Sequence, residues 1–289
     1  MPDSILDFQG PEFLVLYFMV GAGVLLYSRA RLRARELEDA VPRIDLKDAL
    51  GIAYLRGGAR EVLRVATFSL VDRGLLVFDG RTLCTKPRIA STLVRRPLEK
   101  ALIERFLVPG RPSAMFTDAR LRSACDEYAE ALRAHTLIAT QEIYAARRPI
   151  FLLGLLVLVG LAGTKIVVAW NRGHHNVGFL SILALFFLVA LYHMYRRPRT
   201  ARGDEALANL KVLLAGRKSQ SKFLQAGGAN DDAILLAAVY GFGALPANSF
   251  PYLRKLFPKD PGSSNSCGSS CGSGCGGGGC GGGCGGCGS

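Results

Sequence analysis

The chain lacks the short motifs that mark common enzyme classes. Its 289 residues contain no G-x-x-x-x-G-K-[ST] phosphate loop and no H-E-x-x-H zinc motif, and no G-x-S-x-G nucleophile turn precedes its glycine-rich C-terminal end. Ser69 and Asp72 lie close together in the sequence, but no histidine accompanies them as a general base. We therefore predict a protein that is not an enzyme and has no catalytic residues.

Positive charge is also missing at the start of the chain, where no lysine or arginine precedes Arg29. A cleavable signal peptide places positive charge before its apolar run. Here Asp3, Asp7 and Glu12 come before the run instead. The arginines that follow it are Arg29, Arg31, Arg33 and Arg35. This asymmetry predicts an uncleaved membrane anchor whose N-terminus is outside the cell.

Two later apolar runs match the roughly 20 residues that a helix needs to cross a bilayer. Together with the first run they predict transmembrane helices at 13–28, 149–170 and 177–195. Arg147 and Arg148 precede the second helix, and Arg196, Arg197 and Arg199 follow the third. All three helices therefore agree on one orientation by the excess of positive charge on the cytosolic side.

This orientation divides the chain into segments on either side of a membrane. The predicted segments are an external N-terminus 1–12, a cytosolic domain 29–148, an external link 171–176, a cytosolic helical segment 196–260 and a tail 261–289. The formal net charge of +13 is then explained by the cytosolic flanks and by attraction to anionic lipids, so it requires no nucleic-acid partner. The predicted partner is the lipid bilayer itself.

The sequence of the cytosolic domain predicts two helices followed by a β-hairpin. A helix is expected from Asp45, with Asp48 in its first turn, to Gly57–Gly58, and a second over 59–72. LLVFDGRTLC then predicts a hairpin with Asp79–Gly80 as its two-residue turn. Pro97 is expected to begin a third helix, and Thr117–Asp118 to cap a long fourth helix that continues towards the second apolar run. The fold class predicted is mainly α, with a β-hairpin like that of a winged helix.

A winged helix raises the alternative of a membrane-tethered DNA-binding regulator. Arg60, Arg64 and Thr67 would lie on the face of the second helix, and Arg81 and Lys86 on the wing. This helix lacks the asparagine or glutamine usually paired with adenine, and arginine is common along the whole chain. DNA is therefore the less favoured partner.

The last stretch of the chain, 267–289, consists of glycine, serine and cysteine only. Without apolar side chains it has nothing to offset the entropy of ordering its backbone, so we expect it to be disordered. Its candidate metal ligands are Cys267, Cys271, Cys275, Cys280, Cys284 and Cys287. Thiolates are soft ligands for zinc or copper(I), but no histidine or carboxylate accompanies them. An inert flexible tail, a metal-binding tail and a tail modified or processed by an enzyme all remain open.

Several other residues are explained by ordinary structural roles. Cys84 and Cys125 are expected to be buried structural thiols, and the negative charge next to Cys125 opposes thiolate formation. Lys165 lies close enough to the end of its helix for its amine to reach the outer interface. His174–His175 fits a polar turn between two helices. The apolar stretch 233–245 is too short for a confident crossing, and a buried or interfacial helix there would keep the tail cytosolic.

The elements IAYLRGG, residues 52–58, and LVDRGLLVFDG, residues 70–80, resemble a family of bacterial membrane proteins known as near-uncomplex. The matching positions are Ala53, Tyr54, Leu55, Gly57 and Gly58, and the tail from Cys267 matches as well. The resemblance implies bacterial origin, residence in the inner membrane and a Gly/Cys tail typical of the family. It implies no activity.

Together these features predict a multi-pass inner-membrane protein without enzymatic activity. It would present its cysteine-rich, low-complexity tail to a soft metal or to a protein partner on the cytosolic side. The alternatives are the DNA-binding regulator and a carrier of a modified or processed Cys/Gly peptide. No cofactor is required by the sequence, with zinc or copper(I) on the tail as the only candidates.

Overall fold

The computed structural model describes residues 10–37, 48–86, 94–171, 178–220, 227 and 231–258. The six tail cysteines, Asp45 and the histidine pair 174–175 lie outside the described residues. Within those residues the chain is mainly helical, and three helices are long and apolar enough to cross a membrane. The prediction of a mainly α protein with three apolar helices is confirmed.

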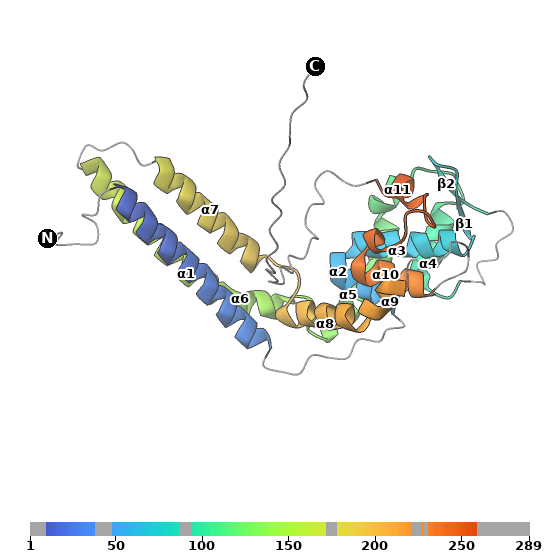
Figure 1. Cartoon of the computed structure of the whole chain (residues 1–289), viewed down its shortest axis with the longest axis horizontal. Coiled ribbons are helices and arrows are strands. Elements are labelled where there is room, and N and C mark those ends of the chain that lie inside the picture. The colour runs from blue at the N-terminus through green and yellow to red at the C-terminus, as the bar shows by residue number, and fades with distance from the viewer. Residues whose placement is uncertain are drawn as a thin grey trace, which may run out of the picture. The chain divides into compact units, whose positions relative to one another are not determined.

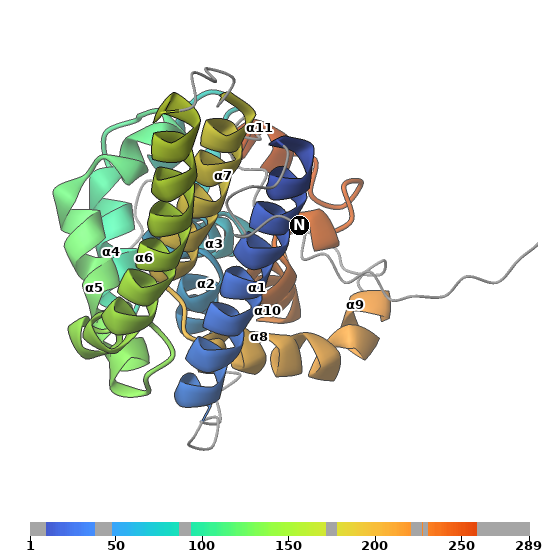
Figure 2. The ribbon, with the colours of Figure 1, turned by 90° about the vertical axis from the view of Figure 1, so that its left-hand side faces the viewer.

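The three long helices are α1 (Gly10–Glu36), α6 (Gln141–Asn171) and α7 (Gly178–Tyr195), and they lie side by side (Figures 1 and 2). Their outward faces are apolar: Leu26, Leu156 and Phe179 are each about two thirds or more exposed, at 68%, 71% and 72%. Water would be a poor solvent for so many exposed aliphatic and aromatic side chains, whereas lipid tails would cover them without cost.

Small residues let these helices approach closely. A Cβ added at Gly21 of α1 would lie 2.6 Å from the ring of Phe187 on α7, so only glycine fits there. Tyr17 is fully buried, and its hydroxyl donates to the carbonyl of Leu158 on α6 at 3.1 Å. This hydrogen bond satisfies a polar group that has no water to contact inside a membrane.

The soluble core is built around α3 (Ala59–Asp72), which is buried over most of its length. Apolar residues on several faces of this helix make it central rather than a surface element. The elements packed around it from the first soluble segment are α2 (Ala49–Gly57), β1 (Leu76–Phe78), β2 (Leu83–Thr85), α4 (Pro97–Arg105), η3 (Pro112–Phe116) and α5 (Ala119–Ala134).

The segment after α7 returns to the same core. Its elements are α8 (Ala201–Leu213), α9 (Ala215–Gln220), α10 (Asp231–Tyr240), η5 (Phe242–Ala244) and α11 (Leu253–Leu256). The apolar helix α10 packs on α2 and α3 (Figure 1), and Ala233 to Val239 are all buried. The ring of Phe68 on α3 contacts the rings of Phe242 and Phe250, with centroids 5.7 and 5.5 Å away. Of the two alternatives for this apolar stretch, the structure supports the buried helix.

Three local details differ from the sequence-based expectations. Asp48 directly precedes α2 as its N-cap residue and does not lie in the first turn. The predicted fourth helix is capped by Asp118 as expected, through the N–H of Arg120 at 2.9 Å, but it ends at Ala134 before α6 begins. The break coincides with Thr136, whose φ of +54° is outside the helical range.

The hairpin is a small two-stranded sheet with a connection longer than predicted. Phe78 pairs with Leu83, so residues 79–82 form the loop, and Asp79–Gly80 is not its two-residue turn. The carboxylate of Asp79 accepts the backbone N–H groups of Arg81 and Thr82 at 2.9 and 2.6 Å. These bonds lower the pKa of Asp79 to about 2, with the two bonds from Thr82 contributing most. They also close the loop by a side chain in place of a tight backbone turn.

The α2–α3 turn depends on two glycines for different reasons. Gly58 has φ +70° and ψ −164°, a region that is essentially restricted to glycine, and its N–H donates to Tyr54 O at 2.7 Å. Of the two glycines at which the helix was expected to end, only Gly58 has a positive φ. Gly57 is the last residue of α2, and a Cβ there would lie 2.2 Å from Glu61 Cγ. Gly57 is needed for space rather than for its backbone angles.

We predict that Gly58→Ala destabilises the soluble core by about 1–3 kcal/mol, because alanine must adopt strained backbone angles there. The measurement is thermal unfolding of the purified full-length protein. Gly216→Ala is the matched control, since Gly216 is helical and its added Cβ would meet open space. That variant should be as stable as the wild type or slightly more stable. Equal melting temperatures for Gly58→Ala and the wild type would contradict the prediction.

Candidate functional site

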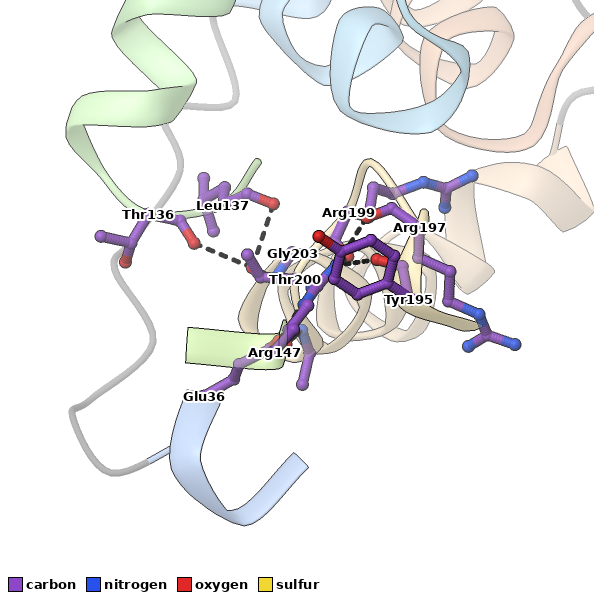
Figure 3. Close-up of polar contacts among 10 residues, drawn as sticks. Glu36, Thr136, Leu137, Arg147, Tyr195, Arg197, Arg199, Thr200 and Gly203 are labelled. Atoms are coloured by element: carbon purple, nitrogen blue, oxygen red, sulfur yellow. Dashed lines mark hydrogen bonds and ion pairs between the residues drawn. The ribbon is translucent and has the colours of Figure 1, made fainter. Parts of the chain in front are cut away.

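Arg147 is a nearly buried arginine where the apolar helices meet the soluble core (Figure 3). It lies near the start of α6, and its guanidinium donates to Glu36 Oε1 at the end of α1 at 2.8 Å. It also donates to three backbone carbonyls around the end of α7, those of Arg197 at 2.7 Å, Arg199 at 3.1 Å and Tyr195 at 3.5 Å. One planar guanidinium thus joins α1, α6 and the α7–α8 connection.

The partner carboxylate, Glu36, is placed at the N-terminus of α8. Its second oxygen accepts the backbone N–H of Ala201, the first residue of that helix, at 2.5 Å. A negative charge is stabilised at this position because the free N–H groups of a helix N-terminus carry partial positive charge. Glu36 therefore has two favourable partners, Arg147 and the start of α8.

Thr200 completes the junction by capping α8. Its Oγ1 accepts the N–H of Gly203 at 3.1 Å and lies 2.8 Å from the carbonyl oxygen of Thr136, to which it can donate. A Cβ at Gly203 would lie 2.3 Å from the carbonyl oxygen of Leu137, so α8 can approach the α5–α6 connection only with glycine there. Figure 3 shows these groups converging around Arg147.

A second arginine carries the network into the soluble core. Arg199 Nη2 donates to the carbonyl of Arg56 at the end of α2 at 2.8 Å. Arg56 in turn donates through Nε to the carbonyl of Ala238 on α10 at 2.7 Å and pairs with Glu61 on α3, which also binds Arg64 at 2.9 Å. Hydrogen bonds therefore connect the ends of the apolar helices to α2, α3 and α10.

This network is suited to holding structure and charge rather than to proton transfer. Burial lowers the pKa of Arg56 from its ordinary value, and the charge of Glu61 opposes that shift. Guanidinium groups stay protonated in proteins, so the network supplies fixed cations and hydrogen-bond donors.

The residues of α3 that were predicted to face DNA differ in their exposure and contacts. Thr67 is fully buried and its hydroxyl lies 3.3 Å from Met115 Sδ, so the prediction that it faces a groove is wrong. Arg64 binds Glu61 and packs over the ring of Phe116. Arg60 is exposed, and so are the two basic side chains predicted on the hairpin, Arg81 and Lys86. The physical reason is that α3 is the central helix of the core and η3 covers its polar side.

The two cysteines outside the tail differ in exposure. Cys125 is fully buried, as predicted; burial, with a smaller contribution from the charge of Asp126, raises the pKa of its thiol to about 12. Cys84 is only half-buried, and its Sγ lies 3.7 Å from the carbonyl oxygen of Val77, so it is not the fully buried thiol that we expected. Within the described ranges no group of three or more His, Cys, Asp or Glu residues is arranged to hold a metal.

Other singled-out residues occupy ordinary positions. Lys165 on α6 is half-buried, and its amine lies 4.7 Å from the ring centroid of Phe13 on α1, a cation–π contact. Asp72 is buried and accepts the N–H of Gly227 at 2.8 Å. His193 is exposed in the last turn of α7.

Comparison with family models, with curated proteins and with solved structures found no match to this chain. The junction around Arg147 was not anticipated from the sequence, where Arg147 and Arg148 were read only as a positive flank. One signal was present: Glu36 ends a helix whose last turns are otherwise basic. A carboxylate is disfavoured at a helix C-terminus unless a cation or another helix start compensates it.

We predict that Arg147→Ala destabilises the protein by about 3–5 kcal/mol, because it leaves Glu36 and several carbonyls without their donor. Arg148→Ala removes the same charge from an exposed neighbour and should change stability little. Arg147→Lys should also lower the stability, because the ammonium group of lysine cannot donate to as many of these acceptors as the planar guanidinium group does. Thermal unfolding of the full-length protein measures all three, and equal effects at positions 147 and 148 would contradict the prediction.

The exposure difference between the cysteines gives a second prediction. At pH 8 a thiol with a pKa of about 12 has almost no thiolate, so native Cys125 should resist iodoacetamide. Cys84 should react under the same conditions, and both should react in denaturant. Peptide mapping by mass spectrometry separates them from the tail cysteines. Alkylation of native Cys125 as fast as Cys84 would show that α5 does not pack as described.

Proposed function

We propose that this chain is a non-enzymatic protein of a bacterial inner membrane that holds its Cys/Gly tail at the cytosolic surface, where a soft metal or a protein partner binds it. Three apolar helices would anchor the protein in the membrane, and the tail would follow the last helix of the soluble core in the chain. The tail would supply thiolates to zinc or copper(I), or a peptide to a partner protein.

One observation carries the proposal: α10 and α11 belong to the same core as α2 and α3. Segments that share a hydrophobic core must lie on the same side of a membrane. The chain therefore crosses an even number of times between them, which α6 and α7 provide. Since α11 ends at Leu256, within this core, we propose that the tail begins on the same side of the membrane as the core.

The orientation rests on charge. The ends of α1 and α7 and the start of α6 that face the soluble core carry the arginines, and positive residues are retained on the cytosolic side during insertion. On this ground we propose that the core and the tail lie in the cytosol and the N-terminus outside. A reducing cytosol would keep the tail cysteines as thiols available to metals.

The family resemblance fits this proposal without extending it. The A-Y-L-x-G-G element forms the end of α2 and its glycine turn, with Gly58 N–H donating to Tyr54 O. We propose membership of the near-uncomplex family on this element and the tail. The DNA-binding alternative gains no support, because Thr67 is buried and Arg64 is paired inside the protein.

Cysteine labelling in intact cells tests the sidedness. The first variant keeps Cys275 and replaces Cys84 and the other tail cysteines by serine; the second also carries Cys275→Ser and His174→Cys. A membrane-impermeant maleimide should label position 174 in intact cells and position 275 only after permeabilisation. The buried Cys125 provides no competing signal. Labelling of position 275 in intact cells would place the tail outside and overturn the proposal.

Intact-mass spectrometry of the protein from its native host tests what happens to the tail. We expect the encoded mass with free thiols. Loss of water or added groups mapping to 263–289 would favour a carrier of a modified peptide, and truncation before Cys267 would favour processing. Metal binding is then tested with the reduced full-length protein. The control is a variant in which the six tail cysteines have a shuffled spacing. If both proteins bind zinc or copper(I) with equal affinity, the spacing of the cysteines does not contribute to metal binding.

A further inference from the structure

A small cavity lies beside the Arg147 junction, and its lining is strongly basic. Its volume is about 130 Å³. The charged residues that line it are Arg29, Arg33, Arg147, Arg197 and Arg199, against the carboxylates Glu36 and Asp204. Leu32 and Met194 add an apolar side. Five guanidinium groups against two carboxylates leave a net positive charge, which favours an anion in the cavity.

The arginines of the cavity fall into two groups. Arg147 uses its guanidinium on Glu36 and three carbonyls, and Arg199 binds the carbonyl of Arg56 and lies 3.5 Å from Asp204. By contrast, no hydrogen bond or ion pair is made by the side chains of Arg29, Arg33 and Arg197 within the described residues. All three are exposed, so their donors are available to a ligand.

The position of these three arginines matches the plane of lipid phosphates. Arg29 directly follows the apolar part of α1, and Arg197 comes two residues after the end of α7. Arg33 lies one turn beyond Arg29 on the same face of α1. If the apolar helices span a bilayer, these side chains are at its surface, where basic pockets between helices bind phosphate-bearing headgroups.

We propose that this cavity binds a phosphate group through Arg29, Arg33 and Arg197, with Arg147 and Arg199 as the fixed positive wall. Planar guanidinium groups bind phosphate oxygens in pairs, and the cavity has room for one such group with a few waters. The charge of Glu36 is balanced by Arg147 and by the N–H of Ala201, so the net positive charge that remains for an anion comes from the other arginines of the cavity. Asp204 is exposed and contacts Arg199 only at 3.5 Å.

The phosphate can come from the headgroup of an anionic phospholipid or from the aqueous phase. Leu32 and Met194 would contact the glycerol and upper acyl carbons of a lipid, a contact that free phosphate cannot make. The experiment therefore has separate arms for the two sources. It is a native mass spectrometry titration of the full-length protein in neutral detergent with phosphatidylglycerol, phosphatidylcholine or inorganic phosphate.

We expect the wild type to retain phosphatidylglycerol in preference to phosphatidylcholine. A variant with Arg29→Gln, Arg33→Gln and Arg197→Gln should bind about 100-fold more weakly, at about fivefold for each charge-assisted guanidinium–phosphate contact that is lost. The matched control carries Arg31→Gln, Arg148→Gln and Arg196→Gln, which remove the same charge at the same boundary outside this cavity; Arg148 and Arg196 line a separate cavity beside Tyr195 that lacks the cluster of five arginines. That control should stay within about twofold of the wild type, since screened charges outside the site contribute little.

Displacement of phosphatidylglycerol by inorganic phosphate would assign the site to phosphate itself, whereas retention of the lipid would assign it to the headgroup. Equal losses in the two triple variants would overturn the proposal and leave general charge attraction in its place. If the first triple variant does not fold, the single variant Arg197→Gln repeats the test with an expected loss of about fivefold. Unchanged affinity in that variant would also overturn it.

Discussion

The structure depends on one buried guanidinium. Arg147 lies on α6 and donates through one side chain to Glu36 at the end of α1 and to the carbonyls of Arg197 and Arg199 after α7. Moving a charged group from water into the protein interior costs several kcal/mol of free energy unless the charge is paired and hydrogen-bonded. Here Glu36 and the carbonyls pair with the guanidinium of Arg147. The acceptors come from two segments, the end of α1 and residues 195–199, so the interaction fixes the ends of α1, α6 and α7 relative to one another. Apolar packing alone would leave these helices freer to slide along one another.

The same chemistry continues into the soluble core and explains how two distant segments share it. Arg199 reaches the carbonyl of Arg56, and Arg56 reaches the carbonyl of Ala238 on α10. Both acceptors are backbone carbonyls near the C-terminal end of a helix, where no backbone N–H of the same helix remains to bind them. Side chains from elsewhere in the sequence supply the missing hydrogen bonds. The return of α10 to α2 and α3 adds the apolar contacts that a core of the first segment alone would lack.

Arginines in this chain have two different roles that charge alone does not distinguish. Those that are buried and multiply bonded, such as Arg147, hold elements together. Those that stay exposed at the same boundary, such as Arg29 and Arg197, leave their donors for a ligand or for lipid headgroups. The fixed inner arginines also raise the local positive potential at which the exposed ones act, so the structural network and the proposed phosphate site are physically linked.

The sequence by itself determined the apolar helices, because a run of about 20 apolar residues is a local property that needs no tertiary partner. The helix ends at Gly58 and Asp118 were readable for the same reason, since caps and turns depend on neighbouring residues. Only the tertiary structure decided which arginines are buried, that Thr67 faces inward, and that α10 completes the core. Arg147 and Arg148 are adjacent and identical in type, and only their acceptors on distant segments separate them. Those acceptors are brought together by packing between residues more than a hundred positions apart, which no local pattern encodes.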